Sequence, residues 1–172
     1  MVPILSLWLP IVLSAVIVFV LSSIVHTVLP HHRGDYRRLP AEDEVMAALR
    51  RYEVPPGDYM VPRPASMKEM RTPEFAAKIA AGPVFHATFW KPSGMAPMLL
   101  QWFAFLILVS VYAAYVTGRA LGPGAHYLEV FRFAGATSFA GYALGYWPMS
   151  IWYRRSWGTT LSTRWTACSM PA

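Results

Sequence analysis

The chain has 172 residues, of which 55% are hydrophobic and 14% charged, and its net charge is +6. Typical soluble domains carry about 25% charged residues, and here the apolar residues fall in three blocks separated by the charges, which favours an integral membrane protein over a soluble domain. The basic balance then reflects the cytoplasmic excess of Lys and Arg in membrane proteins and not nucleic-acid binding, and the single Cys168 excludes an intrachain disulfide.

The first apolar block, residues 4–29, predicts a membrane-spanning helix. Its length at about 1.5 Å per residue is sufficient for a hydrocarbon core of roughly 30 Å. A cleaved signal peptide would have positive charge before a shorter apolar stretch and a small-residue cleavage site after it. Here the positive charge follows the block, beginning at Arg33. We therefore expect a retained helix whose N-terminus lies outside and whose C-terminal end lies at the cytoplasm.

Residues 30–95 form a polar insert, which we expect to be cytoplasmic and to hold two short helices. The acidic run 42–44 is typical of a helix start, because carboxylates favour the positive end of the helix dipole. Thr72 followed by Pro73 predicts a second start, with Thr72 as the N-cap. The proline-rich stretch between them excludes a helix. Residues 84–90 are aromatic and uncharged, and they predict a short strand or an extended segment at the membrane interface.

The second and third blocks predict spanning helices at residues 98–117 and 133–153, joined by an outer link at 118–132. Small residues recur at every fourth position in both, and such residues allow membrane helices to approach closely. We expect an antiparallel hairpin with the two stripes facing, although small residues are also common in membrane helices in general. The predicted packing residues are Ser110, Ala114 and Gly118 in the second block and Thr137, Gly141 and Gly145 in the third.

The distribution of basic residues predicts the orientation in the membrane. Ten of the fifteen Lys and Arg lie in the insert and three in the C-terminal tail, whereas the outer link holds two. The positive-inside rule then places the insert and the C-terminus in the cytoplasm, in a bacterial inner membrane. The expected topology anchors are Arg33, Arg37, Arg38, Arg154 and Arg155. Pro148 is expected to kink the third helix near its end.

The histidines are the only candidate metal ligands. His26, His31 and His32 are predicted to lie at the cytoplasmic end of the first helix, and His86 could approach them from the insert. Their spacings of five and six do not align ligands on one helix face, so interfacial polar anchoring is the alternative interpretation. No cofactor is predicted.

Motifs for chemistry are missing from the sequence: it has no G-x-S-x-G elbow and no H-E-x-x-H helix. Ionisable residues inside membrane helices would indicate a transport path. The second and third blocks hold no Asp, Glu, Lys, Arg or His. We therefore interpret the chain as an all-α, polytopic, non-enzymatic accessory or scaffold component, a single membrane domain whose partners are the lipid bilayer and other membrane subunits or a second copy. The alternative function is a metal-handling protein or lipid-acting enzyme that uses the four histidines.

Several segments together resemble a family of small, uncharacterised bacterial integral membrane proteins. They are HHRGDYRRLP, PPGDYMVP, QWF and YLEVFRFAG with GYALGYWPMSIWYRRSW, and the resemblance covers residues from about 18 to 157. The family has no established activity, so it implies no role for any residue. It does imply a fourth apolar helix, whereas this chain continues after Trp157 with GTTLSTRWTACSMPA.

That tail, residues 158–172, cannot span a bilayer. The codons that its residues require are compatible with a sequence like the family's if residues 162–172 are read in a shifted frame. We therefore expect that this end arises from a frameshift and that the normal product has a fourth helix. Reading the gene past the stop codon tests this: an apolar segment of about 20 residues should appear in the alternative frame.

Overall fold

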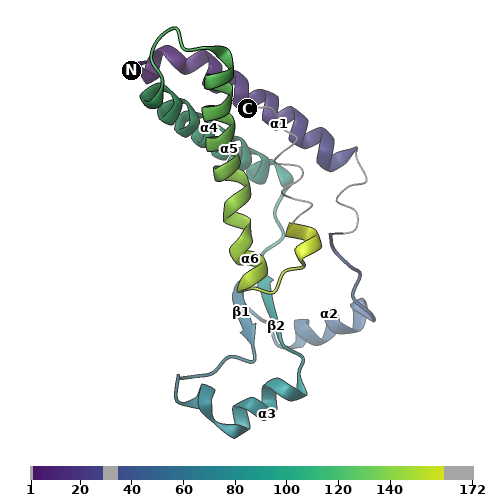
Figure 1. The fold of residues 1–172 in the computed structure, drawn as a ribbon. Coiled ribbons are helices and arrows are strands. Elements are labelled where there is room, and N and C mark those ends of the chain that lie inside the picture. The colour runs from purple at the N-terminus through teal and green to yellow at the C-terminus, as the bar shows by residue number, and fades with distance from the viewer. Residues whose placement is uncertain (1, 29–34, 161–172) are drawn as a thin grey trace. The chain divides into compact units, whose positions relative to one another are not determined.

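The computed structural model describes residues 2–28 and 35–160 of the chain (Figure 1). These residues are mostly helical and form two compact units. The first consists of Met1–Arg37 with Gly94–Ala172, and the second is Arg38–Ser93, which corresponds closely to the predicted polar insert. Each unit is described by itself below.

The first unit begins with a short 3-10 helix, η1 (Ile4–Leu7), which leads directly into α1 (Trp8–Thr27). Four residues on one side of α1 are buried, namely Ile11, Ala15, Val18 and Ser22. Spacings of four, three and four place them on a single stripe of the helix. Phe19, Leu21 and Val25 are partly buried, and most other apolar residues of α1 are exposed, so the protein itself covers mainly one side of the helix.

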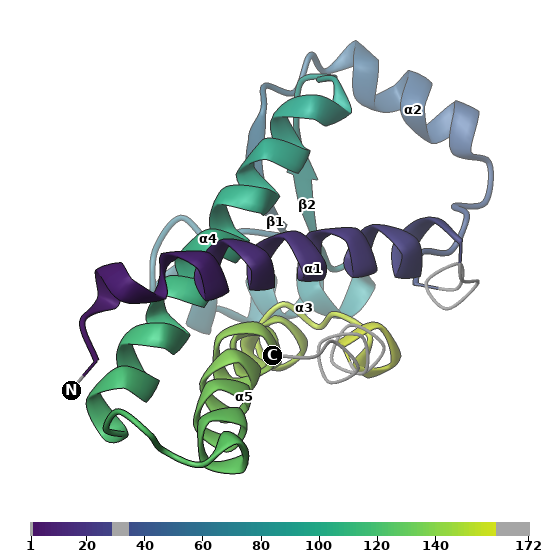
Figure 2. The same cartoon turned by 90° about the horizontal axis from the view of Figure 1, so that it is seen from above.

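Helix α4 (Met95–Ala120) is the central element of the first unit, because both α1 and α5 (Tyr127–Ala143) pack against it (Figure 2). Two hydrogen bonds show that α1 and α4 are antiparallel. At one end Val2 N–H donates to the Gly118 carbonyl at 3.1 Å, and at the other Trp102 Nε1–H donates to Ser22 Oγ at 3.2 Å.

The third apolar block is helical but interrupted. Helix α5 is followed by the 3-10 turn η4 (Leu144–Tyr146) and the short helix α6 (Trp147–Ile151). The break lies where Pro148 predicts it, since a proline ring clashes with the carbonyl of the residue four positions earlier, here Leu144. Beyond α6, the Arg155 guanidinium donates to Tyr36 Oη and the Thr159 hydroxyl to the Asp35 carbonyl, each at 3.3 Å.

Two helices are long and apolar enough to cross a membrane: η1 with α1, over Ile4–Thr27, and α4. Most of their side chains are exposed, unlike those of a core helix in a soluble protein. The described part of the third block does not form one continuous helix of that kind.

The second unit contains α2 (Glu42–Arg51), strand β1 (Gly57–Val61), the 3-10 turn η3 (Glu69–Arg71), α3 (Pro73–Ala81) and strand β2 (Phe85–Phe89). Thr72 caps α3 as predicted, its hydroxyl accepting from Phe75 N–H at 3.2 Å. The strands pair antiparallel, with Tyr59 opposite Ala87. The Thr88 hydroxyl donates to Asp58 across the ladder at 2.7 Å.

The described residues are mostly helical, with one short pair of strands. Residues 84–90, predicted as a strand or an extended segment, contain β2, which pairs with β1 over Phe85–Phe89. The helix bounds also differ: α4 extends past Arg119, and α5 begins at Tyr127, well before residue 133. Charged residues mark the limit of the apolar run, but a helix continues until its capping signals end it.

A capping box explains the early start of α5. His126 Nδ1 accepts from Leu128 N–H at 3.3 Å, and the Glu129 carboxylate accepts from His126 N–H at 3.2 Å. These bonds satisfy backbone donors that a helix N-terminus otherwise leaves unpaired. The link between α4 and α5 is therefore only residues 121–126, and α5 packs against α4.

Candidate functional site

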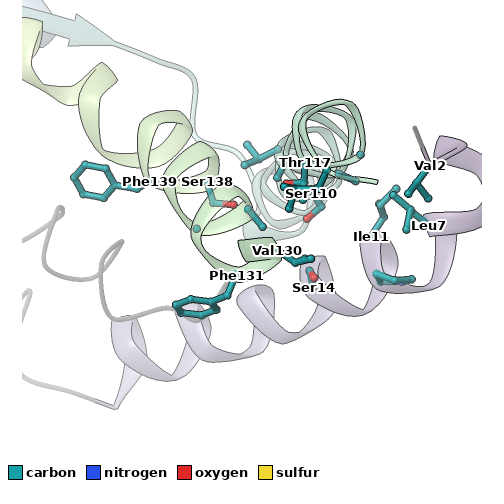
Figure 3. Close-up of a pocket in the computed structure, with 18 of the residues that line it drawn as sticks. Val2, Leu7, Ile11, Ser14, Ser110, Thr117, Val130, Phe131, Ser138 and Phe139 are labelled. Atoms are coloured by element: carbon teal, nitrogen blue, oxygen red, sulfur yellow. The ribbon is translucent and has the colours of Figure 1, made fainter. Parts of the chain in front are cut away.

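A partly open cavity of about 660 Å³ is lined by residues of α1, α4 and α5 (Figure 3). Ile11, Ser14 and Val18 line it from α1. Ala134, Gly135, Ser138 and Phe139 line it from α5. Its volume lies within the roughly 300–1,000 Å³ of small-molecule sites, which are mostly apolar with few polar groups.

The wall formed by α4 consists largely of small side chains. Ser110, Ala113, Ala114, Thr117 and Gly118 all line the cavity, in two successive turns and a half of the helix. Ala113, Thr117 and Gly118 are buried, whereas Ser110 and Ala114 are only partly buried. The open space therefore adjoins these two partly covered side chains most directly.

Thr117 is the one buried side chain in the described residues whose polar atom, Oγ1, has no hydrogen-bond partner. The residue is 8% exposed. Other helical hydroxyls in the unit bond back to their own helix: Ser23 Oγ to the Phe19 carbonyl at 2.8 Å and Thr137 Oγ1 to the Phe133 carbonyl at 2.7 Å. A buried hydroxyl without a partner costs about 1–3 kcal/mol, so Thr117 differs from these residues in carrying a buried hydroxyl that no neighbouring group satisfies.

The packed core of the helical unit borders the cavity at Val18. Ala15 and Leu106 are fully buried and Val18 is nearly so, and together they join α1 to α4. Aromatic rings surround this contact, with Phe19 and Phe103 edge to face at a centroid distance of 5.5 Å. This contact holds α1 and α4 together beside the cavity, and Val18 belongs to both.

The six predicted packing residues occupy different environments. Ser110, Ala114 and Gly118 all line the cavity, and a Cβ on Gly118 would lie 3.3 Å from the Val2 carbonyl oxygen. On α5, a Cβ on Gly141 would lie 3.5 Å from Val109 Cγ1, so this glycine faces α4 closely. A Cβ on Gly145 would meet nothing within 4 Å, and Thr137 is only partly buried.

The predicted histidine cluster is only partly described. His31 and His32 lie outside the described residues. His26 lies in the last turn of α1, with Nδ1 2.7 Å from the Ser22 carbonyl oxygen, whereas His86 belongs to β2 in the other unit. Among the described residues no group of three His, Cys, Asp or Glu side chains could hold a metal ion.

The predicted anchors that can be placed lie in segments that form neither helix nor strand. Arg33 is outside the described residues, and Arg37 and Arg154 are exposed. Arg38 pairs with Glu42 at 3.3 Å on the surface of the second unit. Arg155 contacts Tyr36, so the segments that follow α1 and α6 meet in the first unit.

The sequence analysis selected Ser110, Ala114 and Gly118 of the α4 wall, but not Val109, Ala113 and Thr117, which also line the cavity. The signal was present, because Leu106, Val109, Ala113 and Thr117 recur with helical spacing and are the buried stripe of α4. The residues predicted to pack were instead the small ones that lie one position further along the helix. Thr117 has no sequence signature, since its missing partner depends on its side-chain conformation.

No family model, no curated protein and no solved structure matches the chain.

Proposed function

We propose that the chain is a multi-pass protein of a bacterial inner membrane that serves as a non-enzymatic accessory or scaffold component. It crosses the bilayer three times, with its N-terminus outside and with residues 30–95 and the C-terminus in the cytoplasm. It acts by packing its helices against other membrane subunits or a second copy of itself. The resemblance to small bacterial membrane proteins belongs to the same proposal.

The observation that carries the membrane placement is the exposure of large apolar side chains on both long helices. Leu9 and Leu13 on α1 and Leu100, Leu108 and Tyr112 on α4 are all more than half exposed. Patches of this kind are rare on soluble monomers, whereas hydrocarbon is as apolar as these side chains. The buried stripe on α1 supports a retained helix, because its residues pack on α4.

The hydrogen bonds at the two ends of the helices support the orientation. The Val2–Gly118 bond places the start of α1 beside the end of α4. The Arg155–Tyr36 bond places the segments after α1 and α6 together at the opposite end. Arg37, Arg154 and Arg155 therefore gather at one end of the unit, which the positive-inside rule assigns to the cytoplasm.

Thiol labelling tests the orientation. On a Cys168→Ser background, we would compare Gly122→Cys, where a Cβ meets nothing within 4 Å, with Met67→Cys, which is 65% exposed in the insert. A membrane-impermeant maleimide should label position 122 in intact spheroplasts and position 67 only after lysis. The reverse pattern would refute the orientation.

The scaffold role is tested by the assembly state at native expression level. Protein purified in mild detergent is analysed by native mass spectrometry and light scattering. A fixed stoichiometry with itself or with another membrane protein is expected, and it should persist across several detergents. A monomer under all conditions would contradict the role.

A further inference from the structure

We propose that the exposed face of α4 packs against the same face of α4 in a second copy of the chain, so that the protein is a parallel homodimer in the membrane. The inference rests on the proposed function and deepens it, because it names the partner of the scaffold and the surface that binds it. Two observations carry it: the spacing of the residues on this face and their composition.

The spacing is that of a helix that pairs with another helix. Six residues of α4 between Gln101 and Gly118 are exposed, and five of them, called the α4 face below, are separated by four, three, four and three positions. They are Gln101, Phe105, Leu108, Tyr112 and Tyr115. This is a heptad repeat, which keeps one seam along the whole helix turned toward a partner. The sixth residue, Ala104, is small and directly precedes Phe105.

The α4 face is separate from the side of the helix that the chain itself covers. The buried residues of α4 begin at Leu106. Leu108 follows two positions later, which is about 200° around a helix of 3.6 residues per turn. A second copy can therefore occupy the α4 face while α1 and α5 keep their places.

The composition of the α4 face differs from that of the exposed side of α1. From Val12 to Ile24 every exposed side chain of α1 is Val, Leu or Ile, and hydrocarbon is as apolar as these. The α4 face instead carries one amide and two phenol hydroxyls among its five side chains. A polar group that leaves water without a new hydrogen bond costs free energy. The α1 side therefore suits lipid, whereas the α4 face suits a partner that supplies hydrogen bonds.

Contacts with α1 place Gln101 at the level of the apolar block. Its neighbour Trp102 bonds to Ser22, and α1 continues from there to Thr27, which is about 7.5 Å at the helical rise. Gln101 thus lies level with the apolar part of α1 and not beyond its end. Polar side chains such as glutamine join membrane helices by hydrogen bonds across their interface.

A second copy supplies the matching group at the matching depth. Both copies have the same orientation in the membrane, so a two-fold axis along the membrane normal makes their α4 helices parallel. Each residue near the axis then meets its own counterpart. An amide has both donors and an acceptor, so two Gln101 side chains pair reciprocally, and one polar residue in a heptad seam also fixes the register.

The next heptad position, Arg119, is compatible with this pairing. Its guanidinium lies 5.4 Å from the centre of the Tyr115 ring, near the end of α4 that the proposed orientation places at the outer surface. Salt in the surrounding water screens the repulsion between two such charges.

Cysteine cross-linking in native membranes tests which surface meets a second copy. On the full-length Cys168→Ser background, Leu108→Cys places a thiol in the α4 face, and Leu13→Cys on α1 is the matched control. Leu108 is 64% exposed and Leu13 53%, and the Val2–Gly118 and Trp102–Ser22 bonds put them at nearly the same depth.

Oxidation with copper phenanthroline should link two copies through position 108 and not through position 13. Links at both positions to the same extent, at position 13 alone or at neither would overturn the proposal. A link from position 108 to a different protein, identified by mass spectrometry, would also overturn it.

The amide pairing is tested by Gln101→Leu, which removes the polar group at similar volume. Each variant is labelled at its single Cys168, and Förster resonance energy transfer in liposomes measures the dissociation constant of the dimer. Gln101→Leu should weaken the dimer about three- to twentyfold, the range for one interhelical hydrogen bond. Thr137→Val, which removes a hydroxyl bonded to its own helix, should match the wild type. An unchanged or tighter dimer in Gln101→Leu would overturn the pairing.

These outcomes are separable from the proposed function. Thiol labelling at positions 67 and 122 reports on the orientation, and native mass spectrometry reports on the stoichiometry of the assembly. A fixed assembly with another membrane protein, without a link through position 108, would refute this inference and leave the scaffold role intact. Leu108, Leu13 and Gln101 are exposed, so their substitutions remove no buried contact, and far-UV circular dichroism should show wild-type helix content.

Discussion

The hydrogen bond between Trp102 on α4 and Ser22 on α1 provides the sharpest test of the helix packing. The Trp102 indole N–H donates to Ser22 Oγ at 3.2 Å, and Ser22 Oγ in turn donates to the Phe19 carbonyl at 3.0 Å. Ser22 is 3% exposed. The bond therefore lies in the α1–α4 interface, and it should contribute to the free energy that holds the two helices together.

The expected losses in the free energy of unfolding follow from general values for buried and interhelical hydrogen bonds. Trp102→Phe removes the donor and keeps an aromatic ring, and interhelical hydrogen bonds in membranes average about 0.6 kcal/mol with a maximum of about 1.7. Ser22→Ala leaves the indole N–H without its acceptor, which costs about 1–3 kcal/mol. We expect a coupling energy between the two substitutions of about 0.6–1.7 kcal/mol.

The assay is a double-mutant cycle on unfolding in mixed micelles titrated with SDS, followed by far-UV circular dichroism because one substitution removes a tryptophan. Ser23→Ala is the matched control: Ser23 Oγ donates to the same Phe19 carbonyl at 2.8 Å, and no bond joins it to Trp102 among the described residues. Its coupling to Trp102→Phe should be near zero. A Ser22 coupling equal to the Ser23 coupling would refute the α1–α4 interface described above.

Three further substitutions test other contacts. Ala15→Leu inserts volume at a fully buried position of the α1–α4 core and should lower the free energy of unfolding in the SDS titration by about 1–3 kcal/mol. Val16→Leu is the control, because the neighbouring Val16 side chain is exposed, and it should leave that free energy nearly unchanged. Gly141→Ile forces a branched side chain toward α4 and should destabilise the helix pair by about 1–3 kcal/mol, while Gly145→Ile, with nothing within 4 Å of its Cβ, should cost less; equal losses would contradict the close approach at Gly141. Phe75→Ala removes the one fully apolar side chain that is buried in the described second unit and should increase hydrogen exchange of the α3 amides, with a loss of about 3–5 kcal/mol; unchanged exchange would show that α3 does not depend on it.

The short helices of the insert were predictable because their signals are local. Thr72 with Pro73 specifies a cap and a first turn from neighbouring residues, and the structure shows the hydrogen bond to Phe75 N–H. The acidic run 42–44, in the first turn of α2, acts in the same way through the helix dipole. The break before Pro148 also follows from one residue and its steric clash.

The strand pair and the bounds of α5 were harder to predict. Residues 57–61 could be recognised as non-helical, but their partner β2 lies beyond α3, and pairing over that separation leaves no local pattern. The start of α5 depends on the cap formed by His126 with Glu129. Histidine is an unusual N-cap residue. A prediction that began the helix after the last charged residue therefore placed its start too late.

The cavity shows why small residues alone do not define an interface. Where two helices stay close, a small side chain permits contact, as at Gly141 beside Val109. Elsewhere the same kind of side chain borders open space, as at Ser110 and Ala114, which line the cavity. The difference is set by larger side chains elsewhere: Leu106, fully buried in the core with Ala15 and Val18, fixes α1 on one side of α4. Helix α5 packs on α4 from another direction, and the small residues between them line the gap. A sequence pattern therefore locates the stripe, but the packing of its neighbours decides whether a helix covers it.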